Sequence, residues 1–152
     1  MSTTNRSIPG PPRFGIAVHA LVWLSQSGCV VSSAMMAGQV NSHATFLRRI
    51  MVHLVQAGMV EAKEGRDGGY LLRKSPADIT LADVYLAVKS ECGAEQGAIP
   101  DGEEGGCGAA GQQLDSVLES IMGQAEQHTI EYLRQFTVDD VMRQVDFTAC
   151  KK

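Results

Sequence analysis

Apolar side chains recur at three- and four-residue spacing along most of the chain, a pattern typical of amphipathic helices. It predicts helices over residues 14–27, 33–39, 43–57, 81–90, 112–135 and 137–142. Four of these begin at good capping residues, namely Ser32 or Ser33, Ser42, Thr80 and Thr137. Gly28 and Gly58 follow the first and third helices and supply natural C-terminal stops.

Two short strand-like runs interrupt the helical pattern, at residues 59–63 and 70–73. The segment between them, residues 64–69, holds three glycines. Two strands around a glycine-rich turn predict a β-hairpin.

The stretch before the hairpin carries the features of a helix-turn-helix. A short helix at 33–39 is joined by a tight connection to the amphipathic helix at 43–57. The apolar stripe of that second helix consists of Phe46, Leu47, Ile50, Met51 and Leu54. Its opposite side carries Arg48 and Arg49. The predicted fold class is therefore mainly α with a small β-hairpin wing, a winged helix-turn-helix followed by a long C-terminal dimerisation helix.

The dimerisation helix is expected because the apolar stripe between residues 112 and 135 has little of its own domain left to pack against, so a partner chain is needed. The predicted organisation is a flexible arm, a winged helix-turn-helix domain, an acidic glycine-rich sensor loop, the dimerisation and last helices, and a tail. These parts cover residues 1–12, 13–90, 91–111, 112–145 and 146–152.

The net charge of −4 by itself argues against a nucleic-acid partner, but the charges are unevenly distributed. Through residue 80 there are eight Lys and Arg against four Asp and Glu, a net charge of +4. The remainder has five bases and thirteen acids, a net charge of −8. A basic first half followed by an acidic second half is typical of a protein that contacts DNA with its first half alone.

Other classes of protein find no support in the sequence. No run of 18 apolar residues and no secretory signal is present, so we expect a cytoplasmic protein without a membrane partner. Gly65–Gly69 is not a phosphate loop, because no Gly-Lys-Ser/Thr follows it. With no nucleophile–base pair or paired catalytic carboxylates in a recognisable setting, an enzyme is not expected.

The order of motifs resembles one family. Phe46-Leu47-Arg48-Arg49-Ile50 is followed by Ala57-Gly58-Met59-Val60, then by Gly65-Arg66-Asp67-Gly68-Gly69-Tyr70 and Ile79-Thr80-Leu81-Ala82-Asp83-Val84. Over residues 13–142 the chain is similar to the Rrf-two family of bacterial winged helix-turn-helix regulators. The resemblance implies a sequence-specific regulator of transcription that binds double-stranded operator DNA.

The chain departs from the family at two places. Glu64 stands where the family usually has an arginine before the first wing glycine, so wing contact with phosphate rests on Arg66. Members with an iron–sulfur cluster carry three closely spaced cysteines after the fourth helix. Here that region has only Cys92 and Cys107, with fourteen residues between them. The chain resembles members without a cluster, and no cofactor is expected.

The residues that we expect to contact DNA lie at the front of the second helix of the motif and at the wing tip. They are Ser42, His43, Thr45, Arg48, Arg49, Arg66, Gly68 and Gly69. Plainer roles remain open for each of them: a cap for Ser42, a solvated face for the arginines, and an ordinary hairpin turn for the glycines.

The signal is expected to act through cysteine thiols, with Cys29, Cys92 and Cys107 as candidates. If two of them pair, either Cys29 or Cys92 does so with Cys107, within one chain or across two. The alternative that all are inert stays open. No CxxC motif or close His/Cys spacing is present, so no metal site is expected.

Together these features predict a homodimeric repressor that responds to redox stress. A regulator of the same fold that senses a small molecule is one alternative, and an iron–sulfur or metal-bound sensor is another. A winged helix can also bind protein, but such a partner would not show the steep salt dependence of DNA binding.

Overall fold

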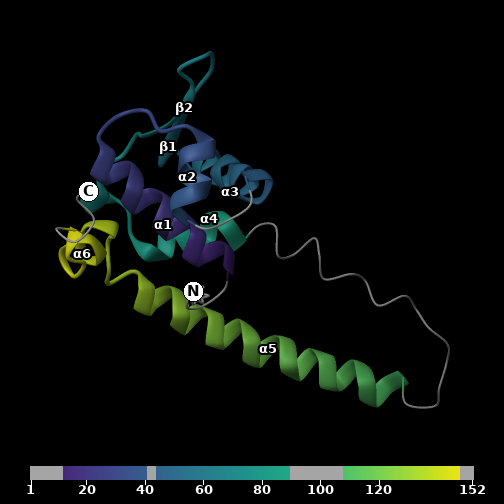
Figure 1. Cartoon of the computed structure of the whole chain (residues 1–152). Coiled ribbons are helices and arrows are strands. Elements are labelled where there is room, and N and C mark those ends of the chain that lie inside the picture. The colour runs from purple at the N-terminus through teal and green to yellow at the C-terminus, as the bar shows by residue number, and fades with distance from the viewer. Residues whose placement is uncertain (1–11, 41–43, 90–107, 148–152) are drawn as a thin grey trace, which may run out of the picture.

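The computed structural model describes residues 12–40, 44–89 and 108–147, which form a compact head and one long projecting helix (Figure 1). In chain order the elements are α1 (Pro12–Ser27), α2 (Ser33–Val40), α3 (Ala44–Gln56), β1 (Val60–Lys63), β2 (Gly69–Leu72), the 3₁₀ turn η1 (Pro76–Asp78), α4 (Leu81–Lys89), α5 (Gly108–Leu133) and α6 (Val138–Arg143). The mainly helical class with one β-hairpin is confirmed.

The core of the head is aliphatic and lies where α1, α3 and α4 meet. Its fully buried side chains include Leu21, Leu24, Leu47, Ile50, Met51, Leu54 and Val84. Each such side chain contributes about 1.5–3 kcal/mol when it leaves water. The described residues include no buried polar or charged side chain, so this core depends on packing alone.

Two helices begin with the reciprocal hydrogen bonds of a capping box. The hydroxyl of Thr80 accepts from the backbone N–H of Asp83, whose carboxylate accepts from the N–H of Thr80, both at 3.1 Å. Thr137 and Asp140 repeat the arrangement at α6. There the hydrogen bond from the backbone N–H of Thr137 lowers the pKa of Asp140, since it stabilises the charged form of the carboxylate.

The β-hairpin is tied to the turn between α1 and α2. Strands β1 and β2 are antiparallel, with Val60 opposite Leu72 and Lys63 opposite Gly69. On the free edge of β2, Val31 and Tyr70 exchange two backbone hydrogen bonds of 2.9 Å each. The sequence did not predict this third segment of sheet, which joins the wing to the helix-turn-helix.

Two of the departures from the expected element boundaries alter the predicted organisation, at the starts of α5 and α1. Helix α5 starts at Gly108, so residues 108–111 are helical although the sequence placed them in the sensor loop. Ala109 and Ala110 favour a helix and outweigh the flanking glycines. Pro12 opens α1 although it was assigned to the arm, and proline is well suited to the first turn of a helix.

None of the helices in the described ranges is both long and apolar enough to cross a membrane. The stretches 1–11 and 90–107, which hold most of the predicted arm and sensor loop, lie outside the described residues.

Replacement of Gly69 by alanine should destabilise the head by about 1–3 kcal/mol, the usual cost of overpacking. A Cβ at this position would lie 2.2 Å from the carbonyl oxygen of Val31, in backbone that cannot easily move. Urea unfolding followed by circular dichroism measures the change. Gly38→Ala is the matched control, since its Cβ would meet nothing within 4 Å inside a helix. Equal stability of the two variants would contradict the close approach.

Candidate nucleic-acid interface

Helix α3 has one face in the core and one face in solvent. Leu47, Ile50, Met51 and Leu54 are buried, as the apolar stripe predicted. The outward face carries Thr45, Arg48, Arg49, Val52 and Gln56, all exposed. Burial of the apolar face therefore fixes which side chains α3 presents to the surroundings.

The two arginines of α3 are available for an external partner. Arg48 and Arg49 are both exposed, and neither forms an ion pair or hydrogen bond with a residue in the described ranges. A guanidinium carries five fixed donors that match the O6 and N7 atoms of guanine or the oxygens of a phosphate. Thr45 lies one turn earlier on the same face. Ser42 and His43, the other candidates at this end, lie outside the described residues.

The wing supplies a second basic position, on the turn between β1 and β2. Arg66 is exposed at the turn of the hairpin and has no ion-pair partner among the described residues. Lys63 in β1 is different, because its ammonium contacts the carboxylate of Glu61 at 3.0 Å. Glu64 and Asp67 are exposed on either side of Arg66, so the tip carries two carboxylates and one guanidinium and is net negative.

The wing glycines have structural reasons to be glycine, independent of DNA. A Cβ on Gly68 would lie 2.5 Å from the carbonyl oxygen of Lys63, and the clash at Gly69 is closer still. Gly68 allows the hairpin turn to close, and Gly69 allows β2 to approach the backbone of Val31. Their expected contact with DNA stays a prediction.

Val52 is a further candidate on the outward face, and the sequence analysis did not single it out. It is 50% exposed in the middle of the polar stripe, seven residues after Thr45 and three or four after the arginines. That spacing was the signal available in the sequence. An exposed valine on such a face can contact the methyl group of thymine.

The one candidate cysteine that the structure describes is Cys29, which is exposed. It lies in the short link between α1 and α2, two residues before Val31, whose backbone is bonded to the wing. The other two candidates, Cys92 and Cys107, lie outside the described residues.

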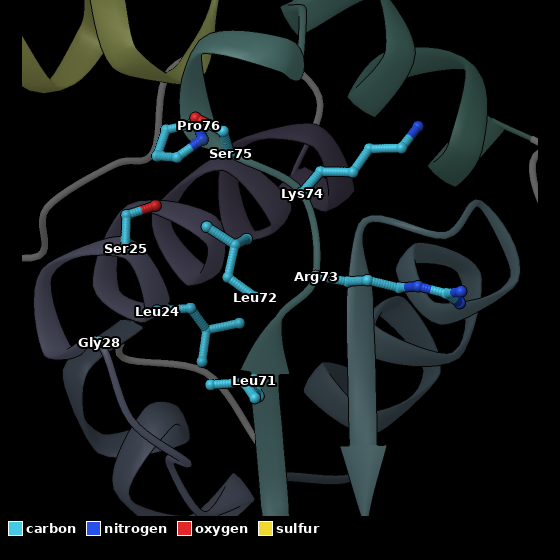
Figure 2. Close-up of a pocket in the computed structure, with 9 residues that line it drawn as sticks. All are labelled: Leu24, Ser25, Gly28, Leu71, Leu72, Arg73, Lys74, Ser75 and Pro76. Atoms are coloured by element: carbon cyan, nitrogen blue, oxygen red, sulfur yellow. The ribbon is translucent and has the colours of Figure 1, made fainter.

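A pocket of 310 Å³ lies between the end of α1 and the segment that leaves β2 (Figure 2). Leu24, Leu71, Leu72 and Pro76 give it an apolar lining, and Ser25 adds a hydroxyl group. Figure 2 shows the side chains of Arg73 and Lys74 directed away from these residues. The volume is at the lower end of the range of small-molecule sites.

Comparison with known proteins decides the family. The model of the Rrf2 family, described as an iron-dependent transcriptional regulator, matches residues 12–144. The chain belongs to the Rrf2 family. It is 32% identical over 136 residues to YwgB of Bacillus subtilis (strain 168), an inferred HTH-type transcriptional regulator, covering 85% of this chain and 81% of YwgB. The family and its relatives are transcriptional regulators and not enzymes, as the sequence predicted.

Solved structures show the same fold. T. potens IscR matches with a TM-score of 0.63 at 19% identity, covering 96% of this chain and 94% of that one. CymR, the global cysteine regulator of B. subtilis, matches with a TM-score of 0.62 at 18% identity, covering 92% and 100%. The winged helix-turn-helix with a long C-terminal helix is therefore the architecture of this Rrf2 member.

The family description raises the question of iron. Within the described ranges, no group of three His, Cys, Asp or Glu side chains is placed to hold a metal ion. Cys29 is the one described thiol, and its immediate neighbours are Gly28 and Val30, which offer no ligating side chain. The described donors do not fit an iron site.

Proposed function

We propose that this Rrf2 protein is a homodimeric repressor that reads a two-fold symmetric operator with α3 and its wing. The observation that supports it most is the outward face of α3, where two arginines without described partners stand beside Thr45 and Val52. A recognition helix of this kind enters the major groove with its N-terminal half. Arg66 at the wing then reaches the adjacent phosphates or minor groove.

The placement of charge supports the same orientation. The basic part of the chain holds α3 and the wing, whereas the acidic part includes α5. In Figure 1 the tip of the hairpin and α5 lie at opposite ends of the molecule. DNA at α3 therefore meets Arg48 and Arg49 and stays distant from the acidic helix.

The second copy is proposed to bind along α5. Six large apolar side chains of this helix are between 49% and 66% exposed, namely Leu114, Val117, Leu118, Ile121, Met122 and Tyr132. An apolar strip of this length in water marks an interaction surface. Four of the six, together with Ala125 and His128, follow alternating four- and three-residue steps: Leu114, Leu118, Ile121, Ala125, His128 and Tyr132. This spacing is that of a coiled-coil seam, which favours another copy of α5 as the occupant.

Removal of both recognition arginines tests the DNA contact. Each bidentate contact with a base is worth about 1–3 kcal/mol. Arg48→Ala with Arg49→Ala should therefore weaken binding to a selected operator at least about 30-fold and leave the dimer intact. Fluorescence anisotropy and sedimentation measure the two properties. Arg134→Ala with Arg143→Ala removes the same charge from a distant part of the chain and should bind normally. Unchanged affinity of the first variant would refute the proposal.

Charges placed in the seam test the dimer. Leu118→Glu with Ile121→Glu should give monomers in sedimentation equilibrium, because the carboxylates would be buried without partners. The head should keep its fold, since neither residue is buried in the single chain. Ser116→Glu with Ser120→Glu adds the same charge to the same helix away from the seam and should leave a dimer. Monomers in both variants would exclude a specific seam.

The signal is proposed to be oxidation of thiols, with Cys107 and either Cys29 or Cys92 as the pair and no iron–sulfur cluster. The exposure of Cys29 next to the segment that anchors the wing supports a link between thiol chemistry and DNA binding. CymR, named a global cysteine regulator, shares the fold. A small-molecule effector is the second candidate, and the pocket of 310 Å³ between the end of α1 and the segment that leaves β2 offers room for a small one.

Oxidant should lower the affinity of the wild-type protein for its operator, and reductant should restore it. The coupling of two sites is commonly 5–150-fold, so an effect of about this size is expected. Cys107→Ser should abolish the response, whereas Cys150→Ser, the tail cysteine, should keep it. A visible absorption band of a cluster in anaerobically purified protein, or full oxidant sensitivity of Cys107→Ser, would overturn this signal.

A further inference from the structure

The head holds only the last turns of α5. Every residue from 108 to 125 is exposed, whereas Glu126 and Leu133 are partly covered and Ile130 is buried. Figure 1 shows the first half of the helix running away from the head. The direction of this long arm is therefore set by contacts near its C-terminal end.

One fixed point lies where the chain leaves α5. The backbone N–H of Leu81 donates to the carbonyl of Phe136 at 2.8 Å, and the N–H of Val138 donates to that of Ile79 at 2.9 Å. Ile130 packs one turn before the end of the helix. These contacts hold the end of α5 on the head, but contacts gathered at one end leave the tilt of the helix weakly determined.

The second fixed point is a pair of polar contacts from α4 to Glu126. The Tyr85 hydroxyl donates to Oε1 at 3.2 Å, and the Lys89 ammonium donates to Oε2 at 2.5 Å. Tyr85 is itself held by α1, since its ring meets that of Phe14 edge-on with centroids 6.0 Å apart. The hydrogen bond from Lys89 lowers the pKa of Glu126, since it stabilises the charged form of the carboxylate.

Small changes at this clamp are amplified along α5. At ~1.5 Å per residue, the helix extends about 27 Å from Glu126 back to Gly108. A tilt of about 10° at Glu126 would move the first turn of α5 by about 5 Å over that length. In a dimer joined along α5, this displacement passes to the second head.

We propose that Glu126, held by Tyr85 and Lys89, is a positioning residue that sets the separation of the two recognition helices and thereby the half-site spacing of the operator. The inference rests on the homodimer of the proposed function. Its physical basis is that successive major grooves lie about 34 Å apart, so two rigid heads fit only one spacing closely. A dimer with a loosened clamp keeps its seam and its recognition residues but tolerates other spacings.

The test compares full-length variants on duplexes of altered spacing. The wild-type protein first selects a duplex from a random pool, and versions with one base pair added or removed between the half-sites are then made. Wild type should bind the selected spacing at least about tenfold more tightly than the altered ones. Glu126→Ala should reduce this preference to less than about threefold and remain a dimer. Glu131→Ala is the matched control, because that carboxylate accepts a hydrogen bond from Gln127 of its own helix.

A charge exchange separates positioning from general stability. Glu126→Lys alone should lose the preference, and Glu126→Lys with Lys89→Glu should recover it by restoring the ion pair in reverse. Tyr85→Phe removes one hydroxyl and serves if larger changes unfold the protein, with a partial loss expected. The inference is overturned if Glu126→Ala lowers the affinity for every spacing equally, or if it leaves the spacing preference unchanged. In either case, binding of the selected duplex by the wild-type protein still upholds the proposed function. A wild-type protein that selects no duplex overturns both.

Discussion

Burial of the apolar face of α3 is the constraint on which the rest of the structure depends. Leu47, Ile50 and Leu54 fill the centre of the aliphatic core and can do so in only one rotation of the helix. That rotation turns Arg48 and Arg49 outward. A polar surface that can read DNA is thus a direct consequence of hydrophobic packing, because the two faces belong to the same thirteen-residue helix.

The wing depends on a different constraint, the close approach of backbone to backbone. Val31 bonds to the outer edge of β2 only because Gly69 has no side chain in the way. The hairpin therefore shares its sheet with the turn that leads into α2. A chemical change in that turn, where Cys29 lies, acts on a segment that belongs to both the helix-turn-helix and the wing. This arrangement gives the proposed thiol signal a physical route to the DNA-contacting surface.

The parts of the fold that could be predicted from the sequence are those determined by residues close to one another along the chain. The stripe of α3, the caps at Thr80 and Thr137 and the hairpin each rest on residues a few positions apart. The contacts that it missed join distant positions: Val31 with Tyr70, and Glu126 with Tyr85 and Lys89. Nothing in local spacing marks such pairs. Helix α5 begins four residues before the predicted start, because Ala109 and Ala110 favour a helix although a glycine stands on either side of them.

Hydroxyl-radical and methylation footprinting of the wild-type protein on its selected duplex would show whether two copies present α3 and the wing to successive grooves. We expect two protected regions related by two-fold symmetry, with guanine N7 atoms shielded in two major grooves about one turn, or 34 Å, apart. Both should fade together as salt is raised. A single protected region, or protection confined to the phosphates without shielding of any guanine, would contradict this arrangement.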